Sequence, residues 1–109
     1  MAVIHFNQEG FDKAVPAAPV ALVDFWAEWC GPCKMLGPTI EKLGKDYEGR
    51  ALIGKVNVDD EPELARRYGV MSIPTVVFFR DGVEFDRKVG LMPEAVYTQV
   101  LEENAVDNP

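Results

Sequence analysis

The chain has 109 residues, 48% of them hydrophobic, and a formal net charge of −7. That size and composition predict one domain over residues 1–109, with a core large enough to fold without metal or disulfide staples. The acidic balance argues against nucleic acids and anionic membrane surfaces as partners, and no stretch approaches the roughly 20 apolar residues of a membrane span.

The first part of the chain predicts a strand, a helix and a second strand. No basic segment followed by a long apolar stretch opens the chain, so we expect no signal peptide. A short strand at residues 3–6 leads to a helix over 8–15, for which Asn7 is a suitable N-cap. Residues 20–27 are apolar on both faces apart from Asp24, which suits a central strand that is covered on both sides.

A second helix is predicted directly after this strand, because apolar residues then recur at helical spacing at Met35, Leu36, Ile40, Leu43 and Tyr47. Pro38 lies inside this helix and should kink it. Residues 51–58 form the next strand. A third helix follows, with Asp60 as its N-cap and Pro62 in its first turn, and it ends near Gly69.

The last part of the chain predicts a hairpin and a final helix. Residues 75–79 and 83–89 are strand-like, and the pair Asp81-Gly82 between them favours a tight primed turn. Pro93 opens a helix whose inner face carries Val96, Val100 and Leu101. Strands that alternate with helices pair in parallel, whereas a hairpin adds antiparallel strands. The chain is therefore predicted to be a mixed α/β protein with three layers.

The only two cysteines, Cys30 and Cys33, stand three positions apart where the buried strand meets the second helix. The free N–H groups and the dipole of a helix N-terminus favour a negative sulfur, and the thiolate is the reactive form of cysteine. We expect Cys30 to attack a disulfide and Cys33, one turn further on, to resolve the mixed disulfide. Two alternatives stay open: half of a zinc site, to which only His5 could add a ligand, and a passive disulfide or pair of inert thiols.

Five other residues have predicted environments. A carboxylate inside an apolar strand is costly to bury, so the pKa of Asp24 should be raised; the alternative is a solvated edge position. Lys55 is by default an exposed strand lysine, and the peptide bond before Pro74 is by default trans. Trp26 is expected in the core, where it packs on the second helix, and Trp29 is expected at the surface.

Several segments together resemble the thioredoxin family, over nearly the whole chain: Trp26–Lys34 (WAEWCGPCK), Val23–Phe25, Lys55–Asp59, Tyr68–Val70 and Ile73–Thr75. The resemblance implies the thioredoxin fold, an α/β/α sandwich in which four helices cover a five-stranded mixed sheet of strand order 1-3-2-4-5. It also implies a protein-disulfide reductase that uses a reversible Cys30–Cys33 dithiol/disulfide couple without a bound cofactor. We therefore expect a cytoplasmic monomer whose partners are disulfide-containing proteins and a flavin- and NADPH-dependent thioredoxin reductase.

The resemblance also implies roles for single residues around the cysteines. Asp24 would lie beneath Cys33 and move protons to and from its sulfur, in general acid–base work. Lys55 would pair loosely with Asp24 and modulate its titration. Gly31 and Pro32, between the two cysteines, are typical of the reducing members of the family, whereas oxidising relatives usually carry a histidine there.

The resemblance further implies a docking groove beside Cys30. It reverses the default for Pro74, whose bond with Ile73 would be cis and face Cys30, so that the Ile73 backbone can pair with an extended substrate strand. The groove would be lined by Trp29, Ile73, Pro74, Gly90 and Leu91. Two rival functions stay open: an oxidase or isomerase, which the Gly31-Pro32 dipeptide disfavours, and a binding module that uses this groove without turnover.

Overall fold

A five-stranded mixed sheet forms the centre of the fold, with its strands in the order β1-β3-β2-β4-β5. The computed structural model describes residues 3–106, so both ends of the predicted domain, residues 1–2 and 107–109, lie outside the described part of the chain. The strands are β1 (Ile4–His5), β2 (Val20–Trp26), β3 (Leu52–Asn57), β4 (Thr75–Arg80) and β5 (Val83–Val89). The helices are α1 (Gln8–Ala17), α2 (Gly31–Asp46), α3 (Pro62–Arg67) and α4 (Glu94–Asn104).

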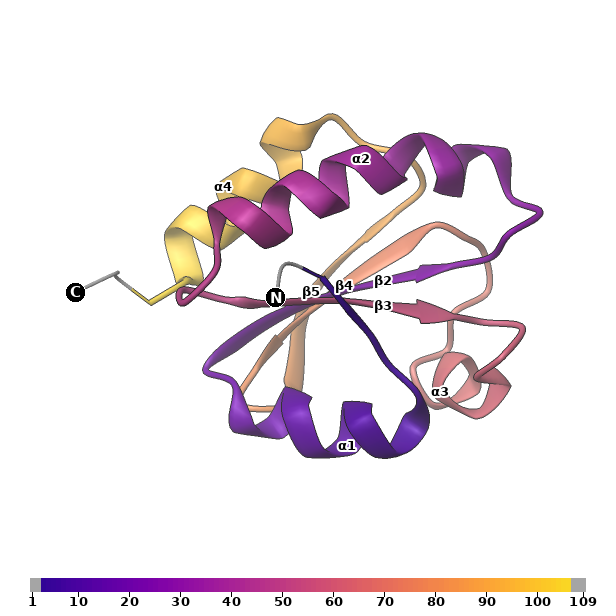
Figure 1. Cartoon of the computed structure of the whole chain (residues 1–109), viewed down its shortest axis with the longest axis horizontal. Coiled ribbons are helices and arrows are strands. Elements are labelled where there is room, and N and C mark those ends of the chain that lie inside the picture. The colour runs from indigo at the N-terminus through magenta and orange to yellow at the C-terminus, as the bar shows by residue number, and fades with distance from the viewer. Residues whose placement is uncertain (1–2, 107–109) are drawn as a thin grey trace.

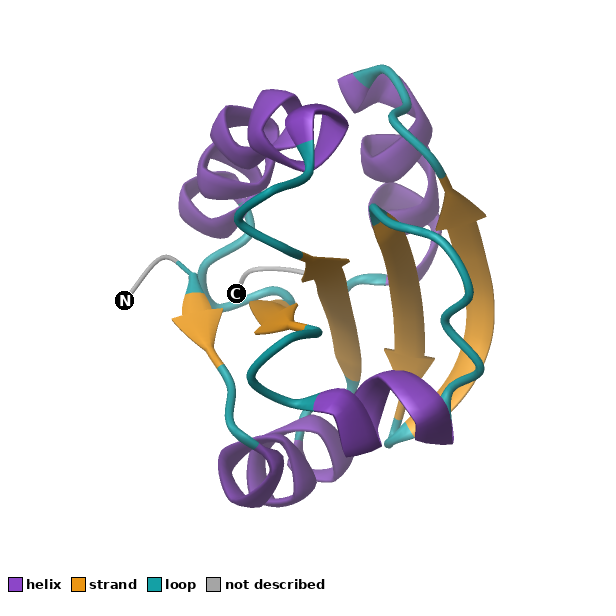
Figure 2. Ribbon diagram, turned by 90° about the vertical axis from the view of Figure 1, so that its right-hand side faces the viewer, coloured by secondary structure: helices purple, strands orange, loops and turns teal. Residues whose placement is uncertain are grey.

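Helices cover both faces of the sheet, which gives the molecule three layers (Figure 1). The helices α2 and α4 lie on one face and α1 and α3 on the other, and Figure 2 shows the same arrangement after a quarter turn. The strands β1, β3 and β2 run parallel, whereas β4 is antiparallel to both β2 and β5. The predicted fold class and strand order are therefore confirmed. No helix among residues 3–106 is long and apolar enough to cross a membrane.

Alternation along β2 divides the core into two layers. Leu22 packs in one cluster with Leu36 of α2, whereas Val23 packs in another cluster with Phe11 of α1. Successive side chains of a strand point to opposite faces of the sheet, so Asp24 lies on the same face as Leu22. The acid that interrupts the apolar strand is thus directed toward the layer of α2 and α4.

Two short-range signals act as the sequence predicts. The side chain of Asn7 accepts a hydrogen bond of 2.8 Å from the backbone N–H of Gly10 and so caps α1. Asp81 and Gly82 both have positive φ angles, 50° and 85°, as a primed turn between β4 and β5 requires. The Asn7 cap determines where α1 begins, and the turn at Asp81 and Gly82 reverses the chain from β4 into β5.

The start of α3 differs from the prediction. Its N-cap position belongs to Glu61 rather than Asp60, and no side chain caps it. The backbone N–H groups of Asp60 and Glu61 instead donate to the Asn57 carbonyl, at 3.1 and 2.9 Å. The Glu61 carboxylate accepts a hydrogen bond of 2.9 Å from the backbone N–H of Gln8. The turn that follows β3 thus begins the helix without the expected side-chain cap.

The inner faces of two helices also differ from the prediction. In α2, Met35 is 69% exposed, whereas the other four apolar residues of the predicted helical pattern, the last of them at the C-cap, are buried. In α4, Val96 is only half-buried, and its neighbour Tyr97 is fully buried instead, with Val100 and Leu101. The inner face of α4 therefore brings a hydroxyl group into the core.

The last described residue, Val106, is tied to the loop that precedes β3. Its backbone N–H donates to the Arg50 carbonyl at 3.2 Å, and the Arg50 Nε donates to the Val106 carbonyl at 3.2 Å. This pairing lies at the opposite end of the molecule from the junction of β2 and α2 (Figure 1).

Gly54 provides a test of the packing between β1 and β3. A Cβ added at Gly54 would overlap the ring of Phe6 and lie 3.1 Å from the Ile4 carbonyl oxygen. We expect Gly54→Ala to lower the free energy of unfolding by about 1–3 kcal/mol in denaturant melts, because a packed core resists added volume. Gly37→Ala in α2 is the control, since its new Cβ would meet no atom within 4 Å. Equal stabilities of the two variants would contradict this account.

Candidate functional site

Cys30 and Cys33 form a disulfide at the start of α2, with their Cα atoms 5.2 Å apart. Cys30 is the N-cap residue, and its sulfur accepts a hydrogen bond of 3.2 Å from the backbone N–H of Cys33. The carbonyl oxygen of Ile73 lies 3.7 Å from the same sulfur. After reduction, the N–H groups and the dipole of the helix N-terminus would stabilise a thiolate on Cys30.

The two cysteines differ in depth. Cys30 is 5% exposed and Cys33 is 1% exposed. Gly31 and Pro32, between them, form the exposed first turn of α2. An incoming disulfide can therefore meet Cys30 at the surface of the site, whereas Cys33 is reached only from within the protein.

Asp24 lies in β2 on the face that α2 covers, and it is fully buried. Neither of its carboxylate oxygens makes a hydrogen bond of normal geometry with another described residue. Burial raises the pKa of Asp24 to about 7, and the positive charge of Lys55 opposes that shift. A carboxyl group that titrates near neutral pH can take up and release protons under working conditions.

Lys55 is buried, so the expectation of an exposed strand lysine is wrong. It stands beside Asp24 in the parallel register of β2 and β3, and it is 8% exposed. Its ammonium group lies 4.2 Å from the centre of the Trp26 ring, which also packs against the cysteine pair. The aromatic face and the nearby carboxylate are what make burial of this charge tolerable.

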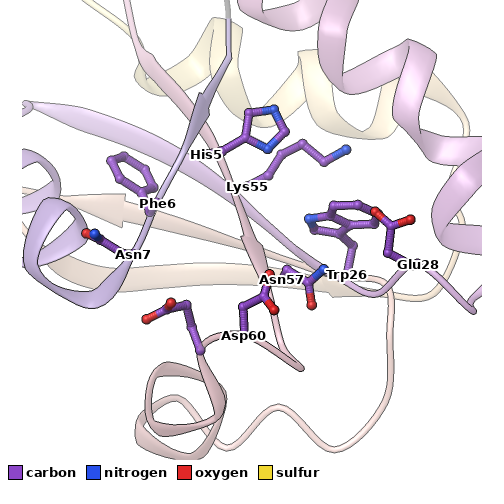
Figure 3. Close-up of a pocket in the computed structure, with 9 residues that line it drawn as sticks. His5, Phe6, Asn7, Trp26, Glu28, Lys55, Asn57 and Asp60 are labelled. Carbon is purple, nitrogen blue, oxygen red and sulfur yellow. The ribbon is translucent and has the colours of Figure 1, made fainter.

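A pocket of about 350 Å³ borders Lys55. Figure 3 shows the Lys55 side chain extending from β3 toward Trp26 and Glu28, with His5 beside it. The pocket is lined by His5, Phe6, Asn7, Trp26, Glu28, Lys55, Asn57, Asp60 and Glu61. His5 is exposed on the edge strand, and within residues 3–106 no three histidine, cysteine or acidic side chains gather as metal ligands would.

Trp29 lies at the surface next to Cys30 and is 71% exposed. Its indole Nε1 donates a hydrogen bond of 2.9 Å to the carboxylate of Asp59. The backbone N–H of Asp59 in turn donates to the side-chain oxygen of Asn57 at 2.9 Å. The turn after β3 therefore holds the indole beside the active-site sulfur.

An apolar groove of about 360 Å³ runs alongside this indole. It is lined by Trp29, Val58, Val70, Met71, Ser72 and Ile73. Sequence reasoning selected Trp29 and Ile73 but missed the other four residues. The sequence signal for two of them is the apolar pair Val70-Met71, which falls between the predicted end of a helix near Gly69 and the next predicted strand. In the structure Met71 is 94% exposed there.

The remaining predicted groove residues lie next to this groove rather than within its lining. The Ile73–Pro74 peptide bond is cis, as the resemblance implies and contrary to the default. The backbone N–H of Gly90 donates to the Pro74 carbonyl at 2.8 Å, with Gly90 at a φ of 90° that favours glycine. Leu91 follows and is 43% exposed. The segments before β4 and after β5 are thus joined beside the groove.

Comparisons with known proteins agree with this arrangement. The family model described as Thioredoxin matches residues 2–103. Thioredoxin from Staphylococcus aureus strain COL is 47% identical over 104 residues, which are 95% of this chain and 99% of that one, and strain USA300 gives the same figures. A mutant thioredoxin from Halobacterium salinarum NRC-1 has a similar structure, with a TM-score of 0.89 and 35% identity over 98% of this chain and 94% of its own. The chain therefore belongs to the thioredoxin family and is a thiol–disulfide oxidoreductase that reduces protein disulfides through its Cys30–Cys33 pair.

Proposed function

We propose that Cys30 is the attacking group of this disulfide reductase and that Cys33 is the resolving group. In the reduced protein, the Cys30 thiolate attacks one sulfur of a target disulfide, and the other target sulfur leaves and takes up a proton. Cys33 then loses its proton and attacks Cys30 in the mixed disulfide. The target departs with both sulfurs reduced, and the Cys30–Cys33 bond closes. Two electrons pass from the cysteine pair to the target without a bound cofactor.

The observation that carries this assignment is the position of the two sulfurs at the start of α2. The Cys33 N–H points at the Cys30 sulfur over 3.2 Å, which favours negative charge on Cys30 in the reduced protein. Cys33 is the more deeply buried of the two, which favours a neutral thiol until a base removes its proton.

Asp24 is proposed to be the base that takes the proton from Cys33. Burial raises its pKa to about 7, so near neutral pH it is present in both the charged and the neutral form. Lys55, its neighbour in the register of the sheet, limits that increase and is proposed to adjust the pH at which Asp24 is charged. Both residues lie on the face of the sheet that α2 covers, which supports a shared role with Cys33.

The target protein is proposed to dock on the exposed surface around Cys30. Trp29 and Ile73 line an apolar groove next to the sulfur, and Gly31 and Pro32 are exposed beside it. We propose that the Ile73 carbonyl receives the extended backbone of the target around its cysteine. The hydrogen-bonded residues Pro74 and Gly90, and Leu91 after them, are proposed to border the same binding surface.

We further propose that a thioredoxin reductase, which uses NADPH and a flavin, donates electrons to the Cys30–Cys33 pair. The protein is proposed to be a monomer that works in the cytoplasm. A pair that must return to the dithiol form after each turnover suits a reducing compartment. The test is reduction of insulin disulfides, first with dithiothreitol and then with reductase and NADPH. A Cys30→Ser/Cys33→Ser variant should lose this reduction completely. If the double variant still fulfilled the biological function of the unmodified protein, the chain would act as a binding module only.

Pro32→His should make the protein more oxidising. A histidine in the exposed first turn of α2 can place positive charge near Cys30, and stabilising the thiolate favours the dithiol form. We expect the equilibrium with glutathione to move toward the dithiol by about tenfold, equivalent to about 30 mV. The measurement is the reduced fraction across a series of glutathione buffers. An unchanged or more negative potential would exclude this role for the dipeptide.

A further inference from the structure

Tyr97 is the buried polar residue of α4, and it lies in the same core layer as Asp24. Its side chain is fully buried and packs in the cluster that contains Leu22 and Val76. Leu22 is two residues before Asp24 on the same face of β2, and Val76 is the residue of β4 that stands opposite Asp24. The phenol therefore enters the layer of the core that holds the buried carboxyl group.

The polar atoms of these two residues are unusual for a protein core. Neither oxygen of Asp24 nor the hydroxyl of Tyr97 makes a hydrogen bond of normal geometry with another described residue. Burial raises the pKa of Tyr97. Hydrogen bonding from the Met92 backbone lowers this pKa, and the negative charge of Asp24 raises it. The phenol therefore stays neutral at working pH and keeps its O–H.

We propose that Tyr97 is a positioning residue whose hydroxyl stabilises the charged form of Asp24, and that it thereby sets the pH range over which Asp24 can accept the proton of Cys33. The inference rests on the proposed role of Asp24. An O–H can rotate to direct its hydrogen toward a carboxylate, and a donor near the charged form favours that form. Tyr97 on α4 would thus lower the pKa of Asp24, as Lys55 on β3 does.

Few other charged or titratable groups face Asp24 from the elements packed around it. Lys55 is the one from β3, and α2 contributes the cysteine pair. The hydroxyl of Tyr47, at the C-cap of α2, is bound instead to Glu102. On β5, Asp86 and Lys88 pair with each other at 3.6 Å. His5 lies exposed on β1 at the outer edge of the sheet.

Tyr97→Phe tests the inference, because it removes only the hydroxyl and keeps the ring that fills the core. The titration of Asp24 is followed through its carboxyl carbon signal in NMR spectra of the oxidised protein. We expect the pKa of Asp24 to rise by about half a pH unit or more. Resolution of a preformed mixed disulfide should slow about twofold or more at pH 7 and match the unmodified protein at pH 9.

Tyr47→Phe is the matched control, since it removes the hydroxyl of another buried tyrosine on the same side of the sheet. It should leave the titration of Asp24 and the pH profile unchanged. An Asp24 titration in Tyr97→Phe that agrees with that of the unmodified protein, or an equal shift in both variants, would overturn the role of Tyr97.

The proposed function is tested separately with Asp24→Asn. If Asp24→Asn slows resolution while Tyr97→Phe changes neither the titration nor the profile, only the inference about Tyr97 fails. If Asp24→Asn resolves mixed disulfides at the normal rate, the proposed proton carrier itself fails. In the double variant Asp24→Asn/Tyr97→Phe, the effect of removing the hydroxyl should no longer depend on pH; a dependence that persisted would contradict action through Asp24.

Discussion

Replacing Cys33 with serine will stop the reaction after its first half. Cys30 keeps its place at the helix N-terminus and can still attack a target disulfide, but no second sulfur is present to release the target. Turnover of insulin disulfides should fall by about 100-fold or more. Covalent adducts between the variant and its targets should accumulate, and non-reducing gels or mass spectrometry of the adducts measure them.

The reverse substitution is the matched control. Cys30→Ser retains the more deeply buried sulfur, so it should neither reduce insulin nor capture targets at a comparable rate. If Cys30→Ser accumulated adducts and Cys33→Ser did not, the roles proposed for the two cysteines would have to be exchanged.

Asp24→Asn should raise stability at high pH and slow the reduction of disulfides. The folded-state pKa of Asp24, about 7, lies above its value of 3.8 when unshifted. A group with a raised folded pKa favours the folded state only while it is protonated, so its contribution turns unfavourable as pH rises from the unfolded value and levels off above the folded value. Asparagine does not ionise, so the free energy of unfolding of the variant does not fall in this way as pH rises.

The expected gain of the variant over the unmodified protein grows from little at pH 4 to as much as about 4 kcal/mol at pH 8, since each pKa unit corresponds to about 1.4 kcal/mol. Denaturant melts of both proteins at the two pH values measure it. Asparagine also cannot accept the Cys33 proton, so insulin reduction should slow near neutral pH. A stability difference that is the same at both pH values would mean that the carboxyl group of Asp24 is solvated in the native protein.

The sequence predicts correctly the positions of those residues whose surroundings depend on their neighbours in the chain. The cysteine pair follows an apolar strand and precedes a helical pattern, so its place at a helix start could be read directly. Asp24 is flanked by apolar residues on both sides, which indicated burial and a raised pKa. The positive φ angles of Asp81 and Gly82 likewise follow from their residue types.

Other features depend on neighbours that are distant in sequence. Lys55 is buried because β2 brings Trp26 and Asp24 next to it, and its own strand gives no hint of that ring. The start of α3 is set by the Asn57 carbonyl rather than by the side chain of Asp60. Helical spacing predicts Val96 on the inner face of α4, whereas Tyr97 enters the core there. Rotating the helix by one residue changes which side chain is buried, and helical spacing alone does not determine that rotation.

The hydrogen bonds between Arg50 and Val106 fix the end of α4 to the loop before β3, which makes this end of the molecule suitable for attachment to a support. These hydrogen bonds lie at one end of a body whose longest dimension is 39 Å, and the start of α2, which holds the cysteine pair, lies at the other end (Figure 1). A chain coupled to a solid support or to a carrier protein beyond Val106 would therefore present its sulfur atoms outward, oriented toward incoming clients. Immobilised through that end, the reductase should retain its solution rate, whereas coupling through the neighbourhood of Trp29 should block access.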